Sequence, residues 1–398
     1  MTGPADSVLA LHPGDLYGFE DLLPDDDKPI VARVRDFAQT HVEPMADTWW
    51  EKAEFPFDLI PKIAALDIVG LGYDWPDRPA RGRLTSSFVV LELARADPSI
   101  ATFFGVHSGL ALGTIQLCGS DEQKSRWLPA MRTMEAIGAF ALTEPEAGSD
   151  VARGLRTTAT RDGDGWVLNG KKRWIGNATF ADLVVIWARD ADDDHVKGFV
   201  VRKDSPGFSA TKIERKLALR TVQNADIELN DCWVPESDRL AGANTFADTA
   251  RVLKLTRGGV GWSAVGAMMR VYELAVDYAK NRQQFGRPLA SFQLIQEHLT
   301  TILANLSMTL AISVRIAQLQ DEGRFDDTQA ALVKLLATTR LRESVARARE
   351  VFGGNGIVLD YKIARFFNDA EALYSYEGTR EMNTLIVGRA ITGVGAFV

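Results

Sequence analysis

The sequence has few cysteines and histidines, and this scarcity argues against several classes of site. Two cysteines, Cys118 and Cys232, stand far apart among 398 residues and form no CxxC pair. Neither a disulfide framework nor a zinc site is expected, and both thiols are predicted to be small buried hydrophobic residues. The five histidines are scattered, and no HExxH, GxSxG or Ser-His-Asp pattern occurs, so the sequence predicts neither a metal site nor a serine hydrolase.

Positive charge is also in short supply. The formal net charge is −8, which argues against nucleic acid or an anionic membrane as the main partner. The first residues, MTGPADSVLALHPGD, lack the basic start and long apolar stretch of a signal peptide, and no uninterrupted apolar run has the length of a bilayer span. We therefore expect a cytoplasmic protein of bacterial type without a membrane span.

The apolar content is sufficient for two or three domains. Apolar residues make up 46% of the chain and charged residues 25%, which is typical of globular proteins. Apolar residues recur at helical spacing in residues 27–47 and again in residues 84–98, where Pro98 ends the pattern. This spacing predicts an N-terminal α-helical domain over residues 1–139.

From residue 156 to about residue 240 the pattern changes to short segments rich in β-branched and aromatic residues. Residues 157–175 predict two strands joined at a Gly-Asp-Gly turn, and Asn169-Gly170 is a strong hairpin signal. Several strands of this kind in close succession predict a middle domain, residues 140–244, built as an antiparallel β-barrel or sandwich.

Long helical patterns return from about Thr245. One apolar face repeats at a spacing of three and four residues and is therefore expected to be buried; it contains Phe292, Ile295, Leu299, Ile302, Leu306 and Leu310. Residues 329–352 form another such pattern. We predict a C-terminal α-helical domain over residues 245–398, and an α+β fold that is mostly α.

Two stretches in the middle of the chain have residues suited to binding, but each also has an ordinary structural explanation. ALTEPEAGSD, residues 141–150, offers free hydroxyls and backbone N–H groups, or a capped junction with Ser149 or Asp150 as the N-cap. KRWIGN, residues 172–177, offers a flat side chain for a flat cofactor, or a tryptophan that fills the core.

Two further stretches lie in the C-terminal part. In RQQFGRPL, residues 282–289, Arg282 either binds a phosphate or ends a helix before a Schellman-type glycine. VFGGNGI, residues 351–357, ends a helix with glycines that let a ligand approach the backbone, but it has neither the GxGxxG register nor a P-loop lysine.

These four stretches occur together, in order, and LYSYEGTREM follows them at residues 373–382. In this combination the sequence resembles the acyl-CoA dehydrogenase family, flavoproteins that desaturate acyl-CoA thioesters. The resemblance extends from about residue 28 to Phe397 and implies the family's fold, with a C-terminal four-helix bundle. The ending YEGTREMNTLIVGRAITGVGAF is most similar to the glutaryl-CoA dehydrogenase branch, whereas KRWIGNATFADL and RTVQNADIEL are similar to the short-chain acyl-CoA oxidases of plant peroxisomes.

The resemblance implies an FAD site, an acyl-CoA site, an electron-transferring flavoprotein as partner and a homotetramer arranged as a dimer of dimers. Five of the implied FAD contacts come from a neighbouring subunit: Arg282, Gln293, Glu350, Gly353 and Gly354. The other implied FAD contacts are Phe140, Leu142, Thr143, Ser149, Trp174, Ile175, Gly176, Phe285, Thr379 and Phe397. The implied acyl-CoA contacts are Ala101, Gly105, Ser149, Arg257, Tyr376 and Gly378.

Glu377 matches the general base of this family. The α C–H of a thioester is a very weak acid, so a carboxylate in a water-poor cleft, where its pKa is raised, suits the reaction. Some members carry the base on the helix that corresponds to residues 253–260, but that stretch is LKLTRGGV and contains no carboxylate. Glu377 therefore has no competitor for this role.

Three departures from the family pattern shape the expected substrate and electron acceptor. Gly176 replaces a threonine near the flavin, and Glu350 replaces a glutamine that faces a neighbouring FAD. Glutaryl-CoA dehydrogenases bind the distal carboxylate of the substrate through an arginine and a serine, which Ala101 and Gly105 replace here. A buried carboxylate without a partner is costly, so a short unbranched acyl chain is expected, and only His107 offers a weak substitute cation.

Three alternatives to a short-chain dehydrogenase stay open at this point. One is a glutaryl-CoA dehydrogenase that performs oxidative decarboxylation. Another is a short-chain acyl-CoA oxidase that passes electrons to oxygen, which the glycine at position 176 suggests. The last is a homologue without flavin that serves as a binding or scaffold subunit; it predicts a colourless protein.

Overall fold

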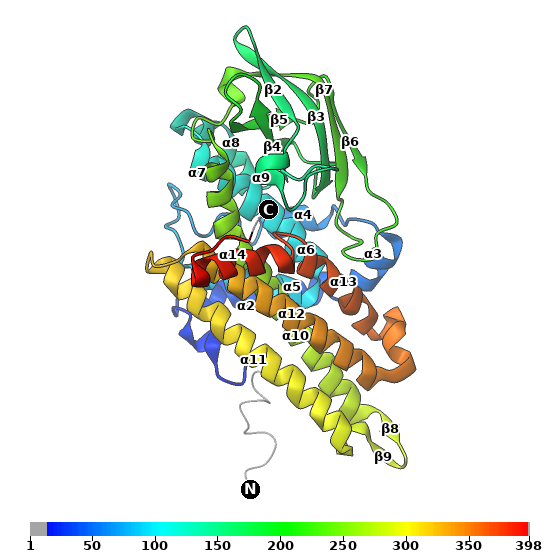
Figure 1. The fold of residues 1–398 in the computed structure, drawn as a ribbon. Helices are drawn as coiled ribbons and strands as arrows, with labels where there is room; N and C mark the ends of the chain where they lie inside the picture. The colour runs from blue at the N-terminus through cyan, green and yellow to red at the C-terminus, as the bar shows by residue number, and fades with distance from the viewer. Residues whose placement is uncertain (1–13, 397–398) are drawn as a thin grey trace.

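A computed structural model describes residues 14–396 of the chain. Helices of the N-terminal third lie between a curled sheet and a bundle of long C-terminal helices (Figure 1). The predicted order of helices, strands and helices is confirmed. The prediction of an α+β fold that is mostly α is confirmed as well. The three-domain division at residues 139/140 and 244/245 stays a prediction; β1 begins at Gly138 and α10 at Phe246.

The N-terminal third contains seven α-helices and two π-helical segments in the described residues. Its helices are α2 (Lys28–Phe37), α3 (Ala46–Lys52), α4 (Leu59–Ala64), α5 (Arg83–Ala96), α6 (Pro98–Phe104), α7 (Leu112–Cys118) and α8 (Asp121–Arg132), with π-helices η3 (Ala38–Val42) and η4 (Gly105–Ala111). The break at Pro98 is confirmed: Asp97 is extended, and its carboxylate caps α6 by accepting from Ile100 N–H at 2.9 Å. The π-helix η4 lies in the middle of an otherwise helical stretch, as is frequent at functional sites.

The middle of the chain forms one mixed sheet of seven strands. They are β1 (Gly138–Ala141), β2 (Thr158–Asp162), β3 (Gly165–Ile175), β4 (Leu183–Asp190), β5 (Val196–Arg202), β6 (Phe208–Lys212) and β7 (Ala225–Pro235). The order is β1-β4-β2-β3-β7-β6, with β5 also paired to β4. The expected antiparallel pairing holds for four of the six strand pairs, whereas β1 and β2 both run parallel to β4. Other elements of the sheet lie in the chain between β1 and β4 and between β2 and β4, and parallel pairing requires such long connections.

One of the two predicted turns in residues 157–175 is confirmed, and the other is wrong. Strands β2 and β3 join where Asp162 pairs with Gly165. Asn169-Gly170 makes no hairpin but lies inside β3, at a shift in its register with β7. The Asn169 side chain donates to Asp231 Oδ1 at 3.0 Å and accepts from Asp231 N–H at 2.8 Å, so the motif serves a cross-strand contact at a bulge.

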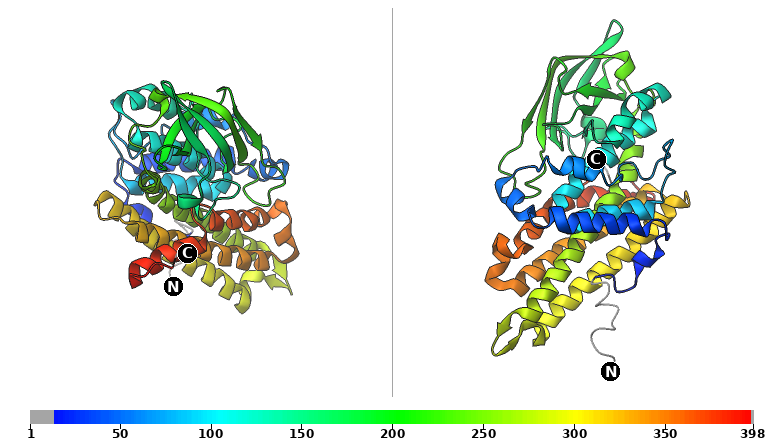
Figure 2. Two further views of the ribbon diagram at one scale, coloured as in Figure 1. Left: turned by 45° about the horizontal axis from the view of Figure 1, so that its top comes forward. Right: turned by 180° about the vertical axis from the view of Figure 1, so that it is seen from behind.

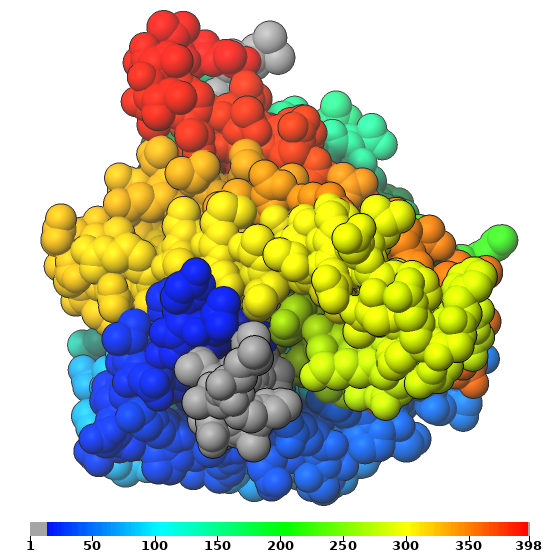
Figure 3. Space-filling view, turned by 90° about the horizontal axis from the view of Figure 1, so that it is seen from below, coloured from blue at the N-terminus to red at the C-terminus, as the bar shows by residue number. Residues whose placement is uncertain are grey.

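The C-terminal part is a bundle of long helices. It comprises α10 (Phe246–Asn281), α11 (Gln293–Asp321), α12 (Asp327–Phe352), α13 (Ile363–Ser375) and α14 (Arg380–Thr392), with a short hairpin β8–β9 (Gln283–Gln284 and Arg287–Pro288) between α10 and α11. Helix α11 crosses the face seen in Figure 3, and α14 projects from one edge of it. The predicted apolar face of α11 is fully buried only from Ile302 onward; Ile295 and Leu299 stay partly exposed in one chain.

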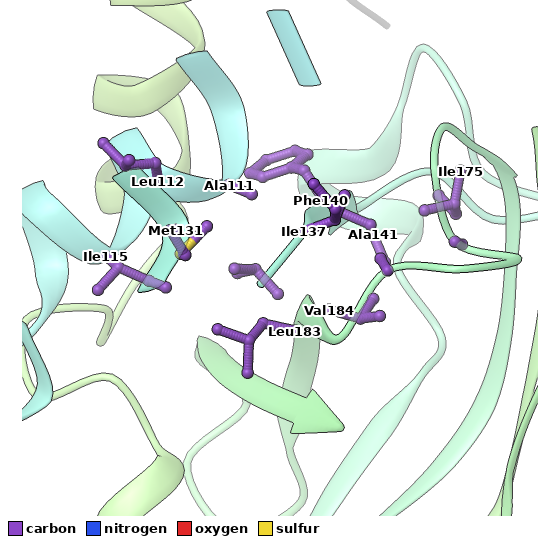
Figure 4. Packing of buried hydrophobic residues seen from close by; sticks show 14 of the residues in the cluster. Ala111, Leu112, Ile115, Met131, Ile137, Phe140, Ala141, Ile175, Leu183 and Val184 are labelled. Carbon is purple, nitrogen blue, oxygen red and sulfur yellow. The ribbon is translucent and has the colours of Figure 1, made fainter. Parts of the chain in front are cut away.

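The two larger of three hydrophobic clusters in the described residues connect the three parts of the chain. One runs from the N-terminal helices into the sheet, where Ala141 of β1 lies near Val184 of β4 and the Phe140 ring points toward Ala111 (Figure 4). The other joins α2 and α5 to the C-terminal bundle, and Figure 2 shows the same layering from behind. Two helical stretches, Pro98–Cys118 and Gln293–Asp321, have the length and composition of membrane spans, and residues of both belong to these cores.

Candidate active site

Glu377 lies in a tight turn between α13 and α14. Its backbone φ is 54° and that of Gly378 is 85°, so two consecutive residues are left-handed. Glycine adopts this conformation without strain, whereas a glutamate does so only when its surroundings hold it. A Cβ added to Gly378 would lie 3.2 Å from Asn383 Nδ2, which leaves little room for a side chain.

The turn directs the Glu377 carboxylate to helix α10. The Thr256 hydroxyl donates to its Oε1 at 3.2 Å and lies 3.4 Å from its Oε2. Burial raises the pKa of Glu377 to about 7, against the opposing effects of Arg257, the Thr256 hydroxyl and Lys334. A carboxyl group with a pKa near neutrality is suited to accept a proton from a weak carbon acid.

Two cations lie close to this carboxylate. Arg257 is 8% exposed and pairs with Asp327 at the start of α12; its Nε has no partner among the described residues. Lys334 of α12 is fully buried and donates to the carbonyls of Tyr374 and Gly378 at 2.7 Å each. Sequence reasoning named Arg257 but missed Lys334, although a lone charge inside ALVKLLA was a signal for it.

The π-helix η4 leaves space open at one of its glycines and approaches Thr256 with another. A Cβ added to Gly105 would meet no atom within 4 Å, and one added to Gly109 would approach Thr256 Cγ2 at 3.7 Å. Thr102 donates to Pro98 O at 2.8 Å, and its hydroxyl lies 3.5 Å from that of Tyr376. Tyr376 therefore lies beside Thr102 of α6, and Gly109 of η4 lies beside Thr256, which contacts Glu377.

Ala101, Gly105 and His107 supply no cation for a second carboxylate. Ala101 is 2% exposed. His107 is fully buried, with Nε2 2.9 Å from Met131 O and Nδ1 accepting from Gly138 N–H at 3.0 Å. Burial lowers the pKa of His107 to about 4, so its ring is neutral at physiological pH. The suggestion that His107 substitutes for the missing arginine is wrong, because both ring nitrogens are already used.

The loop after β1 presents hydroxyls that lack partners. Phe140 and Leu142 are buried in the core, whereas Thr143 is half-buried and Ser149 is exposed. Neither the Thr143 nor the Ser149 hydroxyl has a hydrogen bond within residues 14–396. This loop follows the strand β1 and not a helix, as a helix–strand junction would. Asp150 is at the N-cap position of the short helix α9 (Val151–Gly154), but its side chain makes no capping hydrogen bond.

A buried ion pair holds this loop in place. Lys172 Nζ lies 2.7 Å from Glu144 Oε1, and both side chains are at most 4% exposed. Glu144 also accepts from the backbone N–H groups of Arg156 at 2.6 Å and Thr157 at 2.9 Å. Burial opposes the ionised form, but Lys172 and these donors outweigh it and hold the pKa of Glu144 below its usual value. Neither residue was singled out from the sequence.

The neighbouring loop exposes a flat aromatic face. Trp174 is 50% exposed with φ at 64°, while Ile175 is buried. Thr143 O accepts from the N–H of Arg173 at 2.8 Å, so this loop is joined to the one after β1. A Cβ on Gly176 would lie 3.1 Å from Val106 Cγ2, so Val106 occupies part of the space beside this glycine. An exposed indole beside free hydroxyls fits a flat ring system with polar edges.

Six residues of the expected cofactor site lie elsewhere. They surround β8–β9 and the end of α12, at the opposite end of the bundle from α14 (Figure 1), and are exposed in one chain: Arg282, Phe285, Gln293, Glu350, Gly353 and Gly354. Phe285 is 92% exposed. One chain therefore does not bring these residues to Glu377. Thr379 caps α14 by accepting from Met382 N–H at 3.2 Å, and Phe397 lies outside the described residues.

Comparison with known families identifies the chain. Three family models match it in succession: the acyl-CoA dehydrogenase N-terminal domain over residues 24–135, the middle domain over 139–232 and the C-terminal domain over 246–392. The chain belongs to the acyl-CoA dehydrogenase family. It is therefore a flavin-dependent oxidoreductase of a family that uses FAD.

Similar proteins include a short-chain acyl-CoA dehydrogenase and members of the glutaryl-CoA dehydrogenase branch that the sequence suggested. The human mitochondrial short-chain specific acyl-CoA dehydrogenase is 32% identical over 372 residues, which cover 92% of this chain and 90% of that protein. A crystal structure of glutaryl-CoA dehydrogenase from Mycobacterium smegmatis is 37% identical, with a TM-score of 0.94, covering 97% of this chain and all of that one. Another from the same organism, in complex with FADH2, is 34% identical with the same TM-score and coverage.

Proposed function

We propose that this acyl-CoA dehydrogenase oxidises short, unbranched, uncharged acyl-CoA thioesters to 2-enoyl-CoA, with Glu377 as the base. The observation that carries this proposal is the Glu377 carboxylate, which has a pKa of about 7 and accepts from Thr256 of α10, a residue that also lies beside Gly109 of η4. A base of this strength next to a pocket for an acyl chain suits removal of a proton α to a thioester.

The residues present fit FAD, so we infer which of them hold it. Thr143 and Ser149 offer hydroxyls without partners, and Trp174 offers an exposed ring face, with Ile175 and Gly176 beside it. Thr379 is placed next to Glu377 by the cap of α14. FAD, when bound, supplies the acceptor for the hydride that leaves the β carbon of the substrate.

Glu377 accepts the α proton while the surrounding groups hold its carboxylate in place. The turn at Glu377 and Gly378 brings backbone N–H groups next to the base, where one can donate to the thioester oxygen and stabilise the enolate. Gly378 lets the thioester come close because it has no side chain. Tyr376 and Thr102 line the space next to the acyl chain and keep water away from it.

The residues at positions 101, 105 and 107, none of which supplies a cation, favour an uncharged chain over glutaryl-CoA. Ala101 and Gly105 stand where glutaryl-CoA dehydrogenases are expected to bind the distal carboxylate, and His107 is neutral and occupied. A carboxylate buried there without a partner would cost several kcal/mol, roughly a hundredfold or more in affinity.

A panel of acyl-CoA thioesters tests this function through bleaching of the flavin under anaerobic conditions. We expect butyryl-CoA to reduce the flavin rapidly and glutaryl-CoA to do so poorly. Glu377→Gln should retain FAD and slow the reduction about 100- to 10,000-fold, because it lacks the base. Glu371→Gln, which alters a carboxylate of α13 that pairs with Arg342, is the matched control and should behave as wild type. Rapid reduction of the Glu377→Gln variant would refute the assignment.

We also propose that electrons pass to an electron-transferring flavoprotein. The alternative, an oxidase, is motivated by Gly176, but Val106 fills part of the space that the missing side chain leaves. Mixing the substrate-reduced protein with air distinguishes the two, since rapid reoxidation with release of peroxide would favour the oxidase.

A homotetramer is the third part of the proposal. The residues expected to reach the FAD of a neighbour are exposed at the end of the bundle, together with Phe285 at 92%, Leu294 at 77% and Ile357 at 70%. Large apolar side chains gathered in this way indicate a surface that another subunit covers. Sedimentation of the FAD-containing protein as a monomer would contradict this.

A further inference from the structure

Lys334 is a buried lysine whose contacts converge on the turn that carries Glu377. It lies in α12, and its side chain is fully buried. Its ammonium donates to Tyr374 O and Gly378 O at 2.7 Å each, the carbonyls three residues before and one residue after Glu377. A lysine is rarely buried to this extent without an ion pair, so its two backbone acceptors are what stabilise it there.

A second side chain fixes the same carbonyl. Asn383 of α14 is fully buried, and its Nδ2 donates to Gly378 O at 2.8 Å and to Thr379 O at 3.0 Å. The Gly378 carbonyl therefore accepts from two helices at once. Because Glu377 and Gly378 both have positive φ, the turn needs such external contacts to persist.

The charges that face Glu377 come from the elements packed around it. Arg257 of α10 and Lys334 of α12 are the cations that act on Glu377. Tyr376 precedes Glu377 in the turn. Glu381 of α14 is an acidic group that acts on Lys334. Arg257 already pairs with Asp327. Lys334 has no carboxylate partner within hydrogen-bonding distance in the described residues, so its charge acts on Glu377 without a competing ion pair.

We propose that Lys334 is a positioning residue for Glu377, which holds the two carbonyls that bracket the base and favours its carboxylate form. This inference rests on the proposed function of Glu377. Lys334 does not touch the reacting atoms; it acts through the turn and through its charge.

Two substitutions separate these two effects in the FAD-containing protein. Lys334→Met removes both the donors and the charge, whereas Lys334→Gln keeps an amide donor but removes the charge. The matched control is Arg340→Met, which removes a cation from the same helix that pairs with Glu343 and has no contact with the turn. FAD content, rates of anaerobic flavin reduction by butyryl-CoA and their pH profile are measured for each variant.

We expect Lys334→Met to retain FAD and slow flavin reduction about 10- to 100-fold, because a misplaced base loses alignment with the α proton. In both Lys334 variants the pH midpoint of the rate should move upward, since a nearby positive charge no longer favours the carboxylate. If Lys334→Met does not fold, the pH midpoint of the flavin-reduction rate in Lys334→Gln tests the proposal by itself. Arg340→Met should leave both rate and midpoint as in wild type.

A wild-type rate and an unchanged midpoint in the Lys334 variants would overturn the proposal. A loss of rate with an unchanged midpoint in both variants would also overturn it, since that is what a purely structural lysine predicts. Failure of the proposed function is a separate result: the wild-type flavin would then be reduced by no acyl-CoA in the panel, or Glu377→Gln would stay active.

Discussion

Replacing Lys172 by methionine tests how strongly the buried pair with Glu144 holds the loop at residues 142–149. Lys172 is fully buried and donates to Glu144 Oε1 at 2.7 Å and to Leu142 O at 3.2 Å. Methionine has a similar length and no charge, so it fills the space but leaves the buried Glu144 side chain without its cation.

The expected loss follows from the partners that remain. Glu144 keeps the two backbone donors from Arg156 and Thr157, so it is not entirely unsatisfied. Breaking one side of a buried ion pair costs about 3–5 kcal/mol, and we expect Lys172→Met to lower the free energy of unfolding by about 3 kcal/mol. The double variant with Glu144→Gln removes both charges and should recover most of this loss.

Urea unfolding of Lys172→Met, Glu144→Gln and the double variant, with FAD bound, measures the loss in the free energy of unfolding for each.

The pH dependence of this loss gives a further check. The pKa of Glu144 is lowered in the folded chain, so its stabilisation is present above its unfolded value of 4.5 and is lost as pH falls through the folded value. The gap between wild type and Lys172→Met should therefore narrow in acid. A loss under about 1 kcal/mol, or a double variant no better than Lys172→Met, would refute the reasoning.

Three further predictions concern the turn and the exposed tryptophan. Flavin reduction should increase as pH rises through about 7 and then level off, because only the carboxylate of Glu377 accepts a proton; a flat stopped-flow profile would contradict this. Gly378→Ala should destabilise the protein in urea by about 1–2 kcal/mol and slow flavin reduction, since φ is 85° and Asn383 lies 3.2 Å from the new Cβ. Trp174→Ala should lower the FAD content while hardly changing the unfolding midpoint, because the indole is 50% exposed.

Local patterns predicted the larger elements of the fold because those elements depend on residues close in sequence. The apolar repeat from Ile302 to Leu310 lies in α11, and Pro98 marks the break between α5 and α6 as expected. Parallel pairing of β1 with β4 was not predictable in this way, since it joins segments more than forty residues apart. The hairpin predicted at Asn169-Gly170 was wrong for a similar reason, because the Asn169 side chain contacts Asp231 in a strand that is distant in sequence.

For the candidate site, the sequence by itself determined the family, the FAD requirement and the choice of Glu377 as the proposed base, because a string of short motifs in order is specific even when each one is weak. Only the tertiary structure decided that Thr256 donates to that base, that His107 is neutral and occupied, and that Lys334 holds the turn. The physical reason is that burial, hydrogen-bond partners and pKa shifts arise from neighbours that folding brings together, and 121 residues separate Thr256 from the carboxylate it contacts.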